Sequence, residues 1–479
     1  MTRRALLAAA RTAAVLTAVT ALVAVAPLGS AGAVTPPNPD VAAAPPDGPP
    51  GPDGPMRKNG ACVVGGVLPN SDLAKPPPPL TALQIAQAHK FSTGAGVIVA
   101  VIDTGVRPQP RLPGMIAGGD YVDPASGSNG FDDCEGHGTI VAGIIGAAPA
   151  PTDGLVGVAP NAQILAIRQT SIAYMPENQS ANPDDPNNSR TAGDIRTLAR
   201  AIVHAANMGA RVINISVVSC VKVSNPIDQA MLGGALKYAV EVKDALVVAA
   251  AGNVNASVDA GAGNQSCKSN PEADPSRPQD PRNWDGVTVV STPSWFDDLV
   301  LSVGFVSPDG VRAENSMAGP WVDVAAPGSG IVSLSNGDNA GVINAVPGDQ
   351  GGLVPIAGTS YAAAYVSGLA ALLRSRFPQM TAREVATRII TTAHAPARGV
   401  DNVVGRGLID PVAALTYEIP VQGAPAVTVQ AAELSLPKPP PPPDTAPKWT
   451  AAITVGGIAA AVIVVFIIVA ATGARRGRQ

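Results

Sequence analysis

Three residues of the types that form a nucleophilic catalytic triad stand in short glycine-containing segments of this chain. Asp103 ends the apolar run Val99–Ile102, which is typical of a buried strand. His137 precedes an apolar stretch with helical character, and Ser360 stands in a Gly-Thr-Ser turn before a long alanine-rich helix. A serine hydroxyl needs an imidazole to remove its proton, the imidazole needs a carboxylate to hold its tautomer, and Asp-His-Ser is one known chain order of such a triad. We therefore predict Ser360 as nucleophile, His137 as general base and then acid, and Asp103 as orienting carboxylate.

A fourth segment is suited to stabilise the oxyanion that forms when a serine attacks a carbonyl group. The apolar run Val247–Ala251 leads into Gly252 and Asn253, and the side-chain amide of an asparagine can donate a hydrogen bond. The position of Ser360 at a helix start also directs backbone N–H groups at the same charge. We expect Asn253 to be the fourth catalytic residue.

Each segment also has a simpler interpretation. An Asp-Thr-Gly segment after a strand occurs in aspartic proteases, but these need two such aspartates and the chain has one such segment. A Gly-His-Gly loop could bind a metal ion, yet His89, His204 and His394 stand at no ligand spacing from His137. Ser360 could merely cap a helix, and the asparagine could merely form a turn. The four segments in this order favour catalysis, and we predict neither a metal nor a cofactor.

Four aspartates lie near the histidine segment. The pairs Asp120 with Asp123 and Asp132 with Asp133 could suggest calcium, but they do not have the spacing of a calcium-binding loop. We therefore expect these carboxylates to form a solvated loop face.

The composition excludes one class of partner and indicates export. The 479 residues carry a net charge of −4 with no block of Lys or Arg in the body of the chain, so we expect no nucleic-acid partner. Residues 1–33 have the pattern of a secretory signal peptide, with Arg3 and Arg4, the apolar centre Ala5–Val25 and a small-residue cleavage site at Ala31–Ala33. An uncleaved N-terminal anchor is the alternative.

A second apolar run, Ala451–Thr472, carries no charge and is long enough to cross a bilayer, which takes about 20 residues. We place a membrane helix at residues 450–473 and a cytoplasmic basic tail at 474–479, because Arg475, Arg476 and Arg478 follow the run and positive charge favours the cytoplasmic side. The protein is then single-pass in the cell membrane, with its catalytic domain outside the cytoplasm. A buried core helix is the alternative.

The four cysteines agree with export, because an even number in an exported chain indicates two disulfides. Cys220 follows one predicted strand, and Cys267 lies in the loop after the next. Loops at the carboxyl ends of neighbouring parallel strands cluster, so we expect Cys220 to pair with Cys267. Cys62 then pairs with Cys134 and fastens the N-terminal region near the histidine.

Composition divides the rest of the chain into three parts. Residues 34–88 are a Pro-rich extension. From Val34 to about Leu80 it lacks the apolar pattern of a folded module, which predicts an extended arm, and helical spacing begins at about Leu80. Residues 89–418 alternate predicted strands and helices, which indicates an α/β domain with a parallel sheet, and residues 419–449 are a Pro-rich linker. The predicted strands are Val97–Ile102, Gln163–Ile167, Val212–Ser216, Leu246–Ala250 and Val287–Val290, the helices Asp194–Met208, Pro226–Val242 and Ser360–Phe377, and the long polar loops Thr170–Gly193, Val254–Arg282 and Asn336–Val354.

The catalytic segments resemble those of subtilisin-like serine proteases over roughly residues 89–415. The likeness rests on Asp-Thr-Gly at Asp103, His-Gly-Thr at His137, Ala-Ala-Gly-Asn at Asn253, Gly-Thr-Ser at Ser360, and the closing segment Gly405–Pro411. It implies a three-layer α/β fold with a mostly parallel central sheet, and an endopeptidase acting on a protein or peptide substrate. The layout of signal peptide, Pro-rich arm, protease, Pro-rich spacer and membrane helix resembles the mycosins, and this implies a type VII secretion membrane complex as partner.

The resemblance also implies substrate-binding residues, and the chain departs from the family there. The substrate-binding residues are Ser216, Val217, Val218, Ala251 and Gly252. The family usually has a Leu-Gly-Gly type of sequence after the serine, where glycine lets a substrate backbone approach, so we expect Val218 to narrow the cleft. The arm is a second departure, because it replaces a folded inhibitory propeptide. We expect it to stay attached and to drape over the protease.

Two other roles stay open at this point. The protein could mainly stabilise the secretion membrane complex, with protease activity secondary, because the arm, the long loops and the membrane helix all offer contact surface. It could also be a catalytically inactive binding module, which the four intact catalytic positions argue against.

Overall fold

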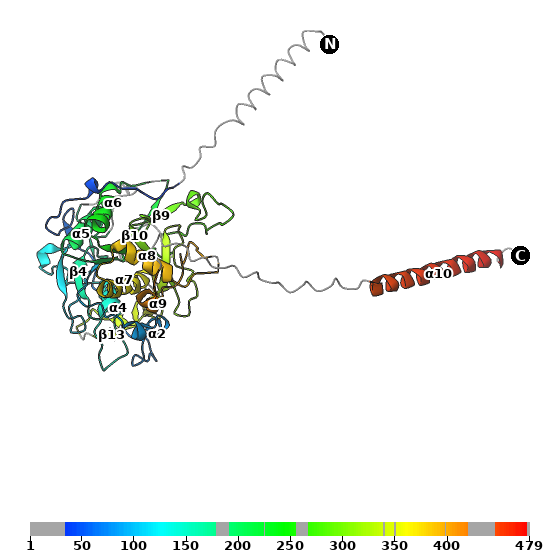
Figure 1. Ribbon diagram of the computed structural model, residues 1–479, viewed down its shortest axis with the longest axis horizontal. Coiled ribbons are helices and arrows are strands. Elements are labelled where there is room, and N and C mark those ends of the chain that lie inside the picture. The colour runs from blue at the N-terminus through cyan, green and yellow to red at the C-terminus, as the bar shows by residue number, and fades with distance from the viewer. Residues whose placement is uncertain are drawn as a thin grey trace, which may run out of the picture. The chain divides into compact units, whose positions relative to one another are not determined.

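The computed structural model describes residues 34–178, 191–224, 226–254, 267–338, 341–348, 351–397, 399–419 and 446–476. The chain divides into two compact units, Met1–Ile419 and Pro420–Gln479 (Figure 1). The predicted signal peptide and most of the predicted linker lie outside the described residues.

A seven-stranded sheet forms the centre of the first unit. Its strands run in the order β11-β10-β8-β6-β2-β4-β3, and every neighbouring pair is parallel. Most strands are short runs of Val, Ile, Leu and Ala that are buried on both faces, which is the pattern of a parallel sheet. Their bounds are Ile98–Asp103 (β2), Ile116–Asp120 (β3), Gln163–Arg168 (β4), Val212–Ile215 (β6), Leu246–Ala250 (β8), Val300–Val306 (β10) and Val322–Pro327 (β11).

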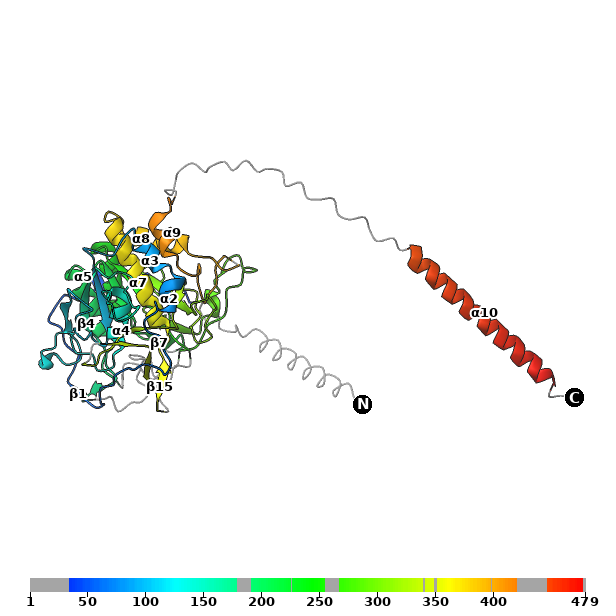
Figure 2. The ribbon, with the colours of Figure 1, turned by 90° about the horizontal axis from the view of Figure 1, so that it is seen from below.

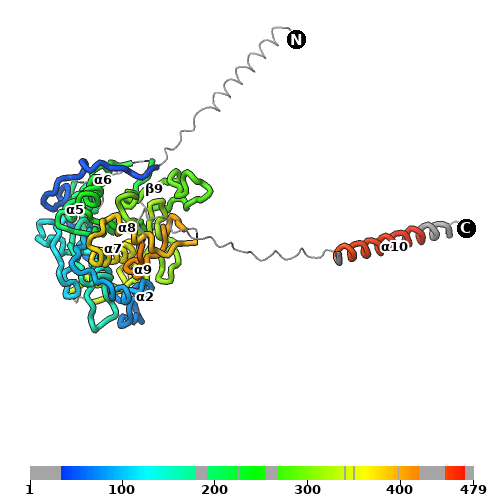
Figure 3. Tube along the Cα trace, viewed as in Figure 1, coloured from blue at the N-terminus to red at the C-terminus, as the bar shows by residue number. Residues whose placement is uncertain are grey.

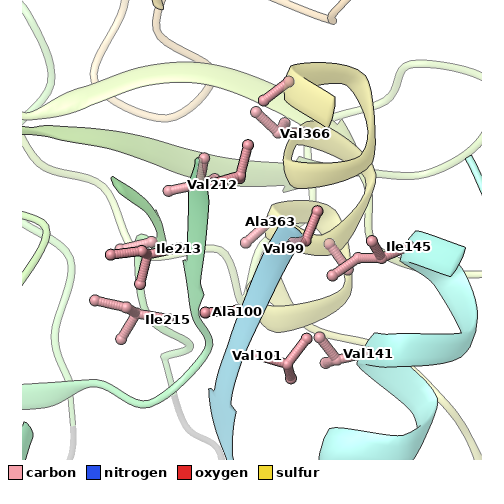
Figure 4. Close-up of a cluster of buried hydrophobic side chains, with 14 of the residues drawn as sticks. Val99, Ala100, Val101, Val141, Ile145, Val212, Ile213, Ile215, Ala363 and Val366 are labelled. Atoms are coloured by element: carbon pink, nitrogen blue, oxygen red, sulfur yellow. The ribbon is translucent and has the colours of Figure 1, made fainter. Parts of the chain in front are cut away.

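Helices cover both faces of this sheet, as the α/β prediction requires. On one face α4 and α7 pack against each other, with α8 and α9 beside α7, while α5 and α6 pack together on the other face (Figures 1 and 2). Figure 4 shows side chains of α4 and α7 against the sheet: Val141 lies beside Val101, and Ile145 and Ala363 lie beside Val99, while Val366 lies near Val212 of β6. The bounds are His137–Gly146 (α4), Ile195–Asn207 (α5), Ala230–Lys237 (α6), Thr359–Arg376 (α7), Ala382–Thr392 (α8) and Pro411–Thr416 (α9).

Four of the five predicted strands are confirmed in the sheet, and the fifth is wrong in its partner. The run predicted at Val287–Val290 is β9, Val289–Thr292, which pairs antiparallel with β7, Ser219–Lys222, in a separate two-stranded ribbon. A short apolar run does not encode the strand that it pairs with. β3, β10 and β11 escape prediction because Gly118 and Gly119, Ser302 and Gly304, and Asp323 interrupt their apolar runs.

Two predicted helices are confirmed, and the third is shorter than predicted. α5 begins after Asp194, whose carboxylate accepts a hydrogen bond from the Thr197 N–H at 2.7 Å. The helix predicted from Pro226 begins only at Ala230 and continues as a π-helix, η3 (Tyr238–Val242). Just before Ala230, the side chain of Gln229 accepts hydrogen bonds from the Trp295 indole and the Thr292 hydroxyl. This tertiary contact replaces the first turn of the predicted helix.

Two predicted long loops contain regular structure. The segment Thr170–Gly193 contains β5, Tyr174–Pro176, and the segment Asn336–Val354 takes part in two small antiparallel pairs, β12 with β13 and β14 with β15. Their bounds are Ser333–Leu334 (β12), Val342–Ile343 (β13), Ala345–Pro347 (β14) and Leu353–Pro355 (β15), and two short 3-10 helices elsewhere are Pro124–Ser126 (η2) and Trp284–Gly286 (η4).

The prediction of an arm without strand or helix is wrong. β1, Met56–Lys58, pairs antiparallel with β5, Tyr174–Pro176, so its hydrogen bonds come from a partner and not from a pattern of its own. The proline run starts a helix, α2 (Pro78–Ala82), because proline fits the first turn of a helix. The other elements of residues 34–88 are η1 (Val41–Ala43) and α3 (Ile85–Ala88), and α3 confirms the helical spacing expected from about Leu80.

The arm packs closely on the rest of the first unit, and Figure 3 shows it beside α6 and α5. A Cβ at Gly234 of α6 would overlap the backbone nitrogen of Ala44, so this glycine admits the arm at short range. Polar contacts join the arm to α5 and α6: Lys237 Nζ to Pro39 O (3.1 Å), His204 Nδ1 to Asp47 Oδ1 (2.9 Å) and Arg200 Nη2 to Asp53 Oδ1 (2.6 Å).

The second unit contains α10, Ala446–Arg476. Among the described residues, α10 is the helix that is long and apolar enough to cross a membrane, with 22 residues from Lys448 to Val469 at a mean hydropathy of 2.9. It begins four residues before the predicted position.

Substitution of Gly234 tests how the arm is held. Alanine in place of glycine inside a helix ordinarily stabilises a protein by about 1 kcal/mol. Because the added methyl would meet the arm backbone, we expect Gly234→Ala to destabilise by about 1–3 kcal/mol instead and to expose residues 34–53 to limited proteolysis. Gly48→Ala is the matched control, because nothing lies within 4 Å of a Cβ there. A more stable Gly234→Ala protein with a protected arm would contradict the packing.

Candidate active site

The carboxyl ends of β2, β6 and β8 bring the predicted catalytic residues together with the starts of α4 and α7. Asp103 is the last residue of β2 and fully buried, and His137 is the first residue of α4. His137 Nδ1 lies 2.7 Å from Asp103 Oδ1, which also accepts the Thr104 N–H at 2.7 Å. A carboxylate on Nδ1 holds the proton there and leaves Nε2 as the basic nitrogen, which a general base requires.

Ser360 is the second residue of α7, and its side chain is nearly buried. Its hydroxyl donates to the carbonyl oxygen of Ser216 at 3.3 Å. The ring of Tyr361, the next residue, lies 5.3 Å from the His137 ring, so the start of α7 is beside the imidazole. The hydrogen bond between nucleophile and base often tightens only when a substrate is bound.

Asn253 follows β8 and is held by the residue that precedes Ser360. Its Oδ1 accepts hydrogen bonds from the Thr359 N–H at 2.9 Å and the Thr359 hydroxyl at 3.1 Å. A backbone N–H can only donate, so this contact assigns the amide oxygen. The NH2 group then lies beside Gly358, 3.3 Å from the position that a Cβ would take there. A Cβ at Gly358 would press on the amide, and glycine avoids this.

The five residues expected to bind substrate lie at the ends of β6 and β8, and all are buried. Ser216 contacts Ser360, and the Gly252 N–H donates to the Thr359 hydroxyl at 3.3 Å. Val217 and Val218 pack within the main hydrophobic core. The expected narrowing of a cleft by Val218 stays a prediction.

The structure joins the cysteines as the sequence predicts. Cys62 is bonded to Cys134 and Cys220 to Cys267, and no free cysteine remains. The first disulfide ties the arm to the loop that leads into His137.

The expectation of a solvated loop face is wrong for two aspartates. Asp133 is 4% exposed and Asp120 is 1% exposed. Asp120 accepts the N–H groups of Val122 and Asp123, both at 2.8 Å. Asp133 accepts the N–H group of Gly136 at 2.8 Å. Both carboxylates therefore fix the backbone of their own loops. The signal that could have revealed Asp133 is its place three residues before the Gly136 helix cap, where an aspartate can accept free N–H groups.

The described residues contain no group of three or more His, Cys, Asp or Glu side chains placed to hold a metal ion.

Comparison with known proteins assigns this arrangement to a family. Residues 94–407 match the subtilase (peptidase S8) family model. Mycosin-1 of Mycobacterium tuberculosis (strain ATCC 25618 / H37Rv) is 53% identical over 392 residues, which cover 81% of this chain and 84% of that protein. The chain is a mycosin of the subtilase family. The expected family, the subtilisin-like fold and the serine endopeptidase activity are thereby confirmed.

Solved structures agree with this assignment. This mycosin is similar to MycP1, described as a serine protease and an essential component of the type VII (ESX-1) secretion system, with 51% identity and a TM-score of 0.75 over 80% of this chain and 100% of that chain. It is also similar to a chain of an intact ESX-5 inner membrane complex, with 45% identity and a TM-score of 0.75 over 92% of this chain and 100% of that chain.

A pair of substitutions at Asn253 separates its donor from its acceptor. Asn253→Asp keeps an oxygen for Thr359 but loses the NH2 donor, whereas Asn253→Ala loses both. If the NH2 group stabilises the oxyanion, both variants slow labelling by a fluorophosphonate probe by about 10²–10³-fold. Normal labelling of Asn253→Asp would show that the asparagine only holds Thr359. Thermal unfolding curves check that both variants are folded.

Proposed function

We propose that this mycosin cleaves proteins or peptides with the triad Asp103, His137 and Ser360, and that Asn253 stabilises the oxyanion. The observation that carries the proposal is the 2.7 Å contact between His137 Nδ1 and the buried Asp103, beside the start of α7. In this arrangement the carboxylate holds the proton on Nδ1, so Nε2 of His137 can remove the proton of a serine hydroxyl.

The reaction then follows from the placement of the groups. His137 Nε2 takes the proton as Ser360 Oγ bonds to the scissile carbonyl carbon, and Asp103 stabilises the imidazolium. The negative oxygen receives hydrogen bonds from the Asn253 amide and the Ser360 N–H. When the intermediate collapses, the C–N bond breaks and His137 gives its proton to the leaving amine. Water repeats the sequence on the acyl-enzyme and frees Ser360.

We also propose that the chain is anchored in the cell membrane by α10 and acts in a type VII secretion membrane complex. Support comes from the apolar Lys448–Val469 segment and from the likeness to a chain of the ESX-5 inner membrane complex. The basic residues after α10 favour a cytoplasmic C-terminus, with the catalytic unit on the other side. The net charge of −4 supports a role without nucleic acid.

A structural role is the second candidate, and the arm favours it. The arm presents an exposed face over α5 and α6, and relatives of this chain are parts of a membrane complex. In this case the protein stabilises the complex, and proteolysis is secondary.

Ser360→Ala tests the proposed activity and separates the two candidates. The variant has the same fold but no nucleophile, so we expect no labelling by a fluorophosphonate probe. In cells, we compare the secreted proteins of a deletion strain, a Ser360→Ala strain and the wild type. Loss of secretion only in the deletion strain indicates a structural role. Loss of secretion in both strains indicates that proteolysis is needed, and N-termini that are present in the wild type but missing in the Ser360→Ala strain identify the substrates. Labelling of Ser360→Ala would overturn the assignment.

Protease treatment of intact, wall-stripped cells tests the topology. The proposed orientation predicts that the catalytic unit is released by cuts in residues 420–445, while the tail after α10 stays protected. The reverse orientation would carry arginines across the bilayer, at about 2.5–3.5 kcal/mol each at the membrane centre. A protected catalytic unit with an accessible tail would contradict the proposal.

A further inference from the structure

The start of α4, which carries His137, has no capping side chain of its own. Its N-cap residue is Gly136, in the left-handed conformation, and no side chain at that position can accept the free N–H groups of the first turn. The carboxylate of Asp133 takes this role from the preceding loop. It accepts the Gly136 N–H at 2.8 Å and the Thr139 N–H at 2.9 Å.

Two hydroxyl groups complete the environment of this carboxylate. Thr104 Oγ1 lies 2.8 Å from Asp133 Oδ1, and Thr139 Oγ1 lies 2.6 Å from Asp133 Oδ2. Each hydroxyl already accepts a backbone N–H: that of Gly138 binds Thr104 Oγ1 at 3.0 Å, and that of Arg107 binds Thr139 Oγ1 at 2.9 Å. Each hydroxyl proton is thus directed at Asp133.

Four donors therefore surround one carboxylate, two at each oxygen. A protonated carboxyl would have to donate to one of the two threonine hydroxyls, because the two N–H groups can only donate, and each hydroxyl already accepts a backbone N–H. The contacts thus fit the ionised form of Asp133. Burial raises the pKa of Asp133 and the nearby charge of Asp103 raises it further, so both oppose the ionisation that the four donors favour.

The same network reaches both members of the catalytic pair. Thr104 follows Asp103, Gly138 follows His137, and the hydrogen bond from the Gly138 N–H to the Thr104 hydroxyl joins them. A Cβ at Gly138 would overlap the carbonyl oxygen of Gly105, so the first turn of α4 lies directly on the end of β2. Asp133 holds that turn and that strand end at the same time.

We propose that Asp133 is a positioning residue, an ionised carboxylate that fixes the Asp103–His137 pair through Thr104 and the first turn of α4 and adds negative charge beside the imidazole. Asp133 does not touch the reacting atoms, and its effect passes through the two residues that it holds. The inference rests on the proposed roles of Asp103, His137 and Ser360.

The charge gives the proposal a readout that a purely structural role lacks. A negative charge favours the imidazolium form, so its loss lowers the pKa of His137 and moves the acidic limb of the pH–rate profile to lower pH. The other charged groups around this region are Asp103 at the end of β2, Asp132 and Glu135 in the same loop, and Arg168 at the end of β4, which pairs with Asp132 and Asp120. These remain in place when Asp133 alone is neutralised.

The experiment measures the rate of fluorophosphonate labelling of the full chain in detergent between about pH 5 and pH 9. For Asp133→Asn we expect a maximal rate lower by about 10²-fold, because a small displacement of a catalytic group has an effect of this size. We expect the acidic limb to move down by roughly one pH unit. Asp120→Asn is the matched control: it is an equally buried aspartate that also accepts backbone N–H groups, and it has no contact with α4. We expect its acidic limb to coincide with that of the wild type.

Two results overturn the proposal. One is an Asp133→Asn protein with the rate and acidic limb of the wild type. The other is a slower Asp133→Asn protein whose limb does not move and whose thermal stability falls as that of Asp120→Asn does, because this indicates a structural cap only. Ser360→Ala is labelled in parallel to separate failure of the Asp133 proposal from failure of the catalytic assignment. If Ser360→Ala reacts with the probe, the catalytic assignment itself is wrong.

A second pair of variants keeps the test open if Asp133→Asn does not fold. Thr104→Ser keeps the hydroxyl that joins Asp133 to the Gly138 N–H, and Thr104→Val removes it. We expect Thr104→Ser to label much faster than Thr104→Val, and neither to move the acidic limb, because the charge of Asp133 is retained. Equal rates for the two variants would overturn the proposed linkage through Thr104.

Discussion

The close approach of the first turn of α4 to the end of β2 is the contact on which the catalytic geometry depends. The Gly138 N–H binds the Thr104 hydroxyl at 3.0 Å, and a Cβ at Gly138 would lie 3.1 Å from Asp103 Cβ. A larger residue would lift α4 from the strand and lengthen the 2.7 Å contact between His137 and Asp103. Burial of α4 against α7 and β2 supplies the apolar packing that holds this approach, and Asp133 satisfies the N–H groups that the approach removes from water.

The start of α7 is also joined to the end of a strand by hydrogen bonds, and here Thr359 makes them. Thr359 donates its N–H and its hydroxyl to Asn253 Oδ1, and its hydroxyl accepts the Gly252 N–H. A single threonine thus connects the end of β8 with the start of α7, and it sets the positions of the residues proposed as oxyanion donor and nucleophile. Both halves of the site are therefore built where a parallel strand ends and a buried helix begins, and the loop residues Asp133 and Asn253 hold each helix start in place.

Sequence predicts those parts of this structure whose conformation is determined by residues close to them in the chain. The apolar runs of β2, β4, β6 and β8 encode buried parallel strands, and the motif residues at their ends encode the site. Partners distant in sequence are not encoded in this way: β9 is a typical apolar run, yet it pairs with β7, outside the central sheet. Asp133 shows the same limit for polar residues. In sequence it belongs to a charged pair in a loop. Its place before the Gly136 cap indicates a capping role, but its burial and its contact with the distant Thr104 appear only in the structure.

The disulfide between Cys62 and Cys134 connects the arm to the hydrogen bonds around Asp133. Cys134 follows Asp133 directly, its carbonyl oxygen accepts the Val63 N–H at 2.8 Å, and Asn336 Nδ2 donates to the carbonyl oxygens of both Val63 and Asp133. An inhibitory propeptide has to leave the enzyme after it is cut. A cut in this arm would leave the segment around Cys62 bonded to the residue next to Asp133, as long as the disulfide is oxidised. The arm is thus bound covalently to the loop that supports His137 while the disulfide is intact, which favours the expectation that it stays attached.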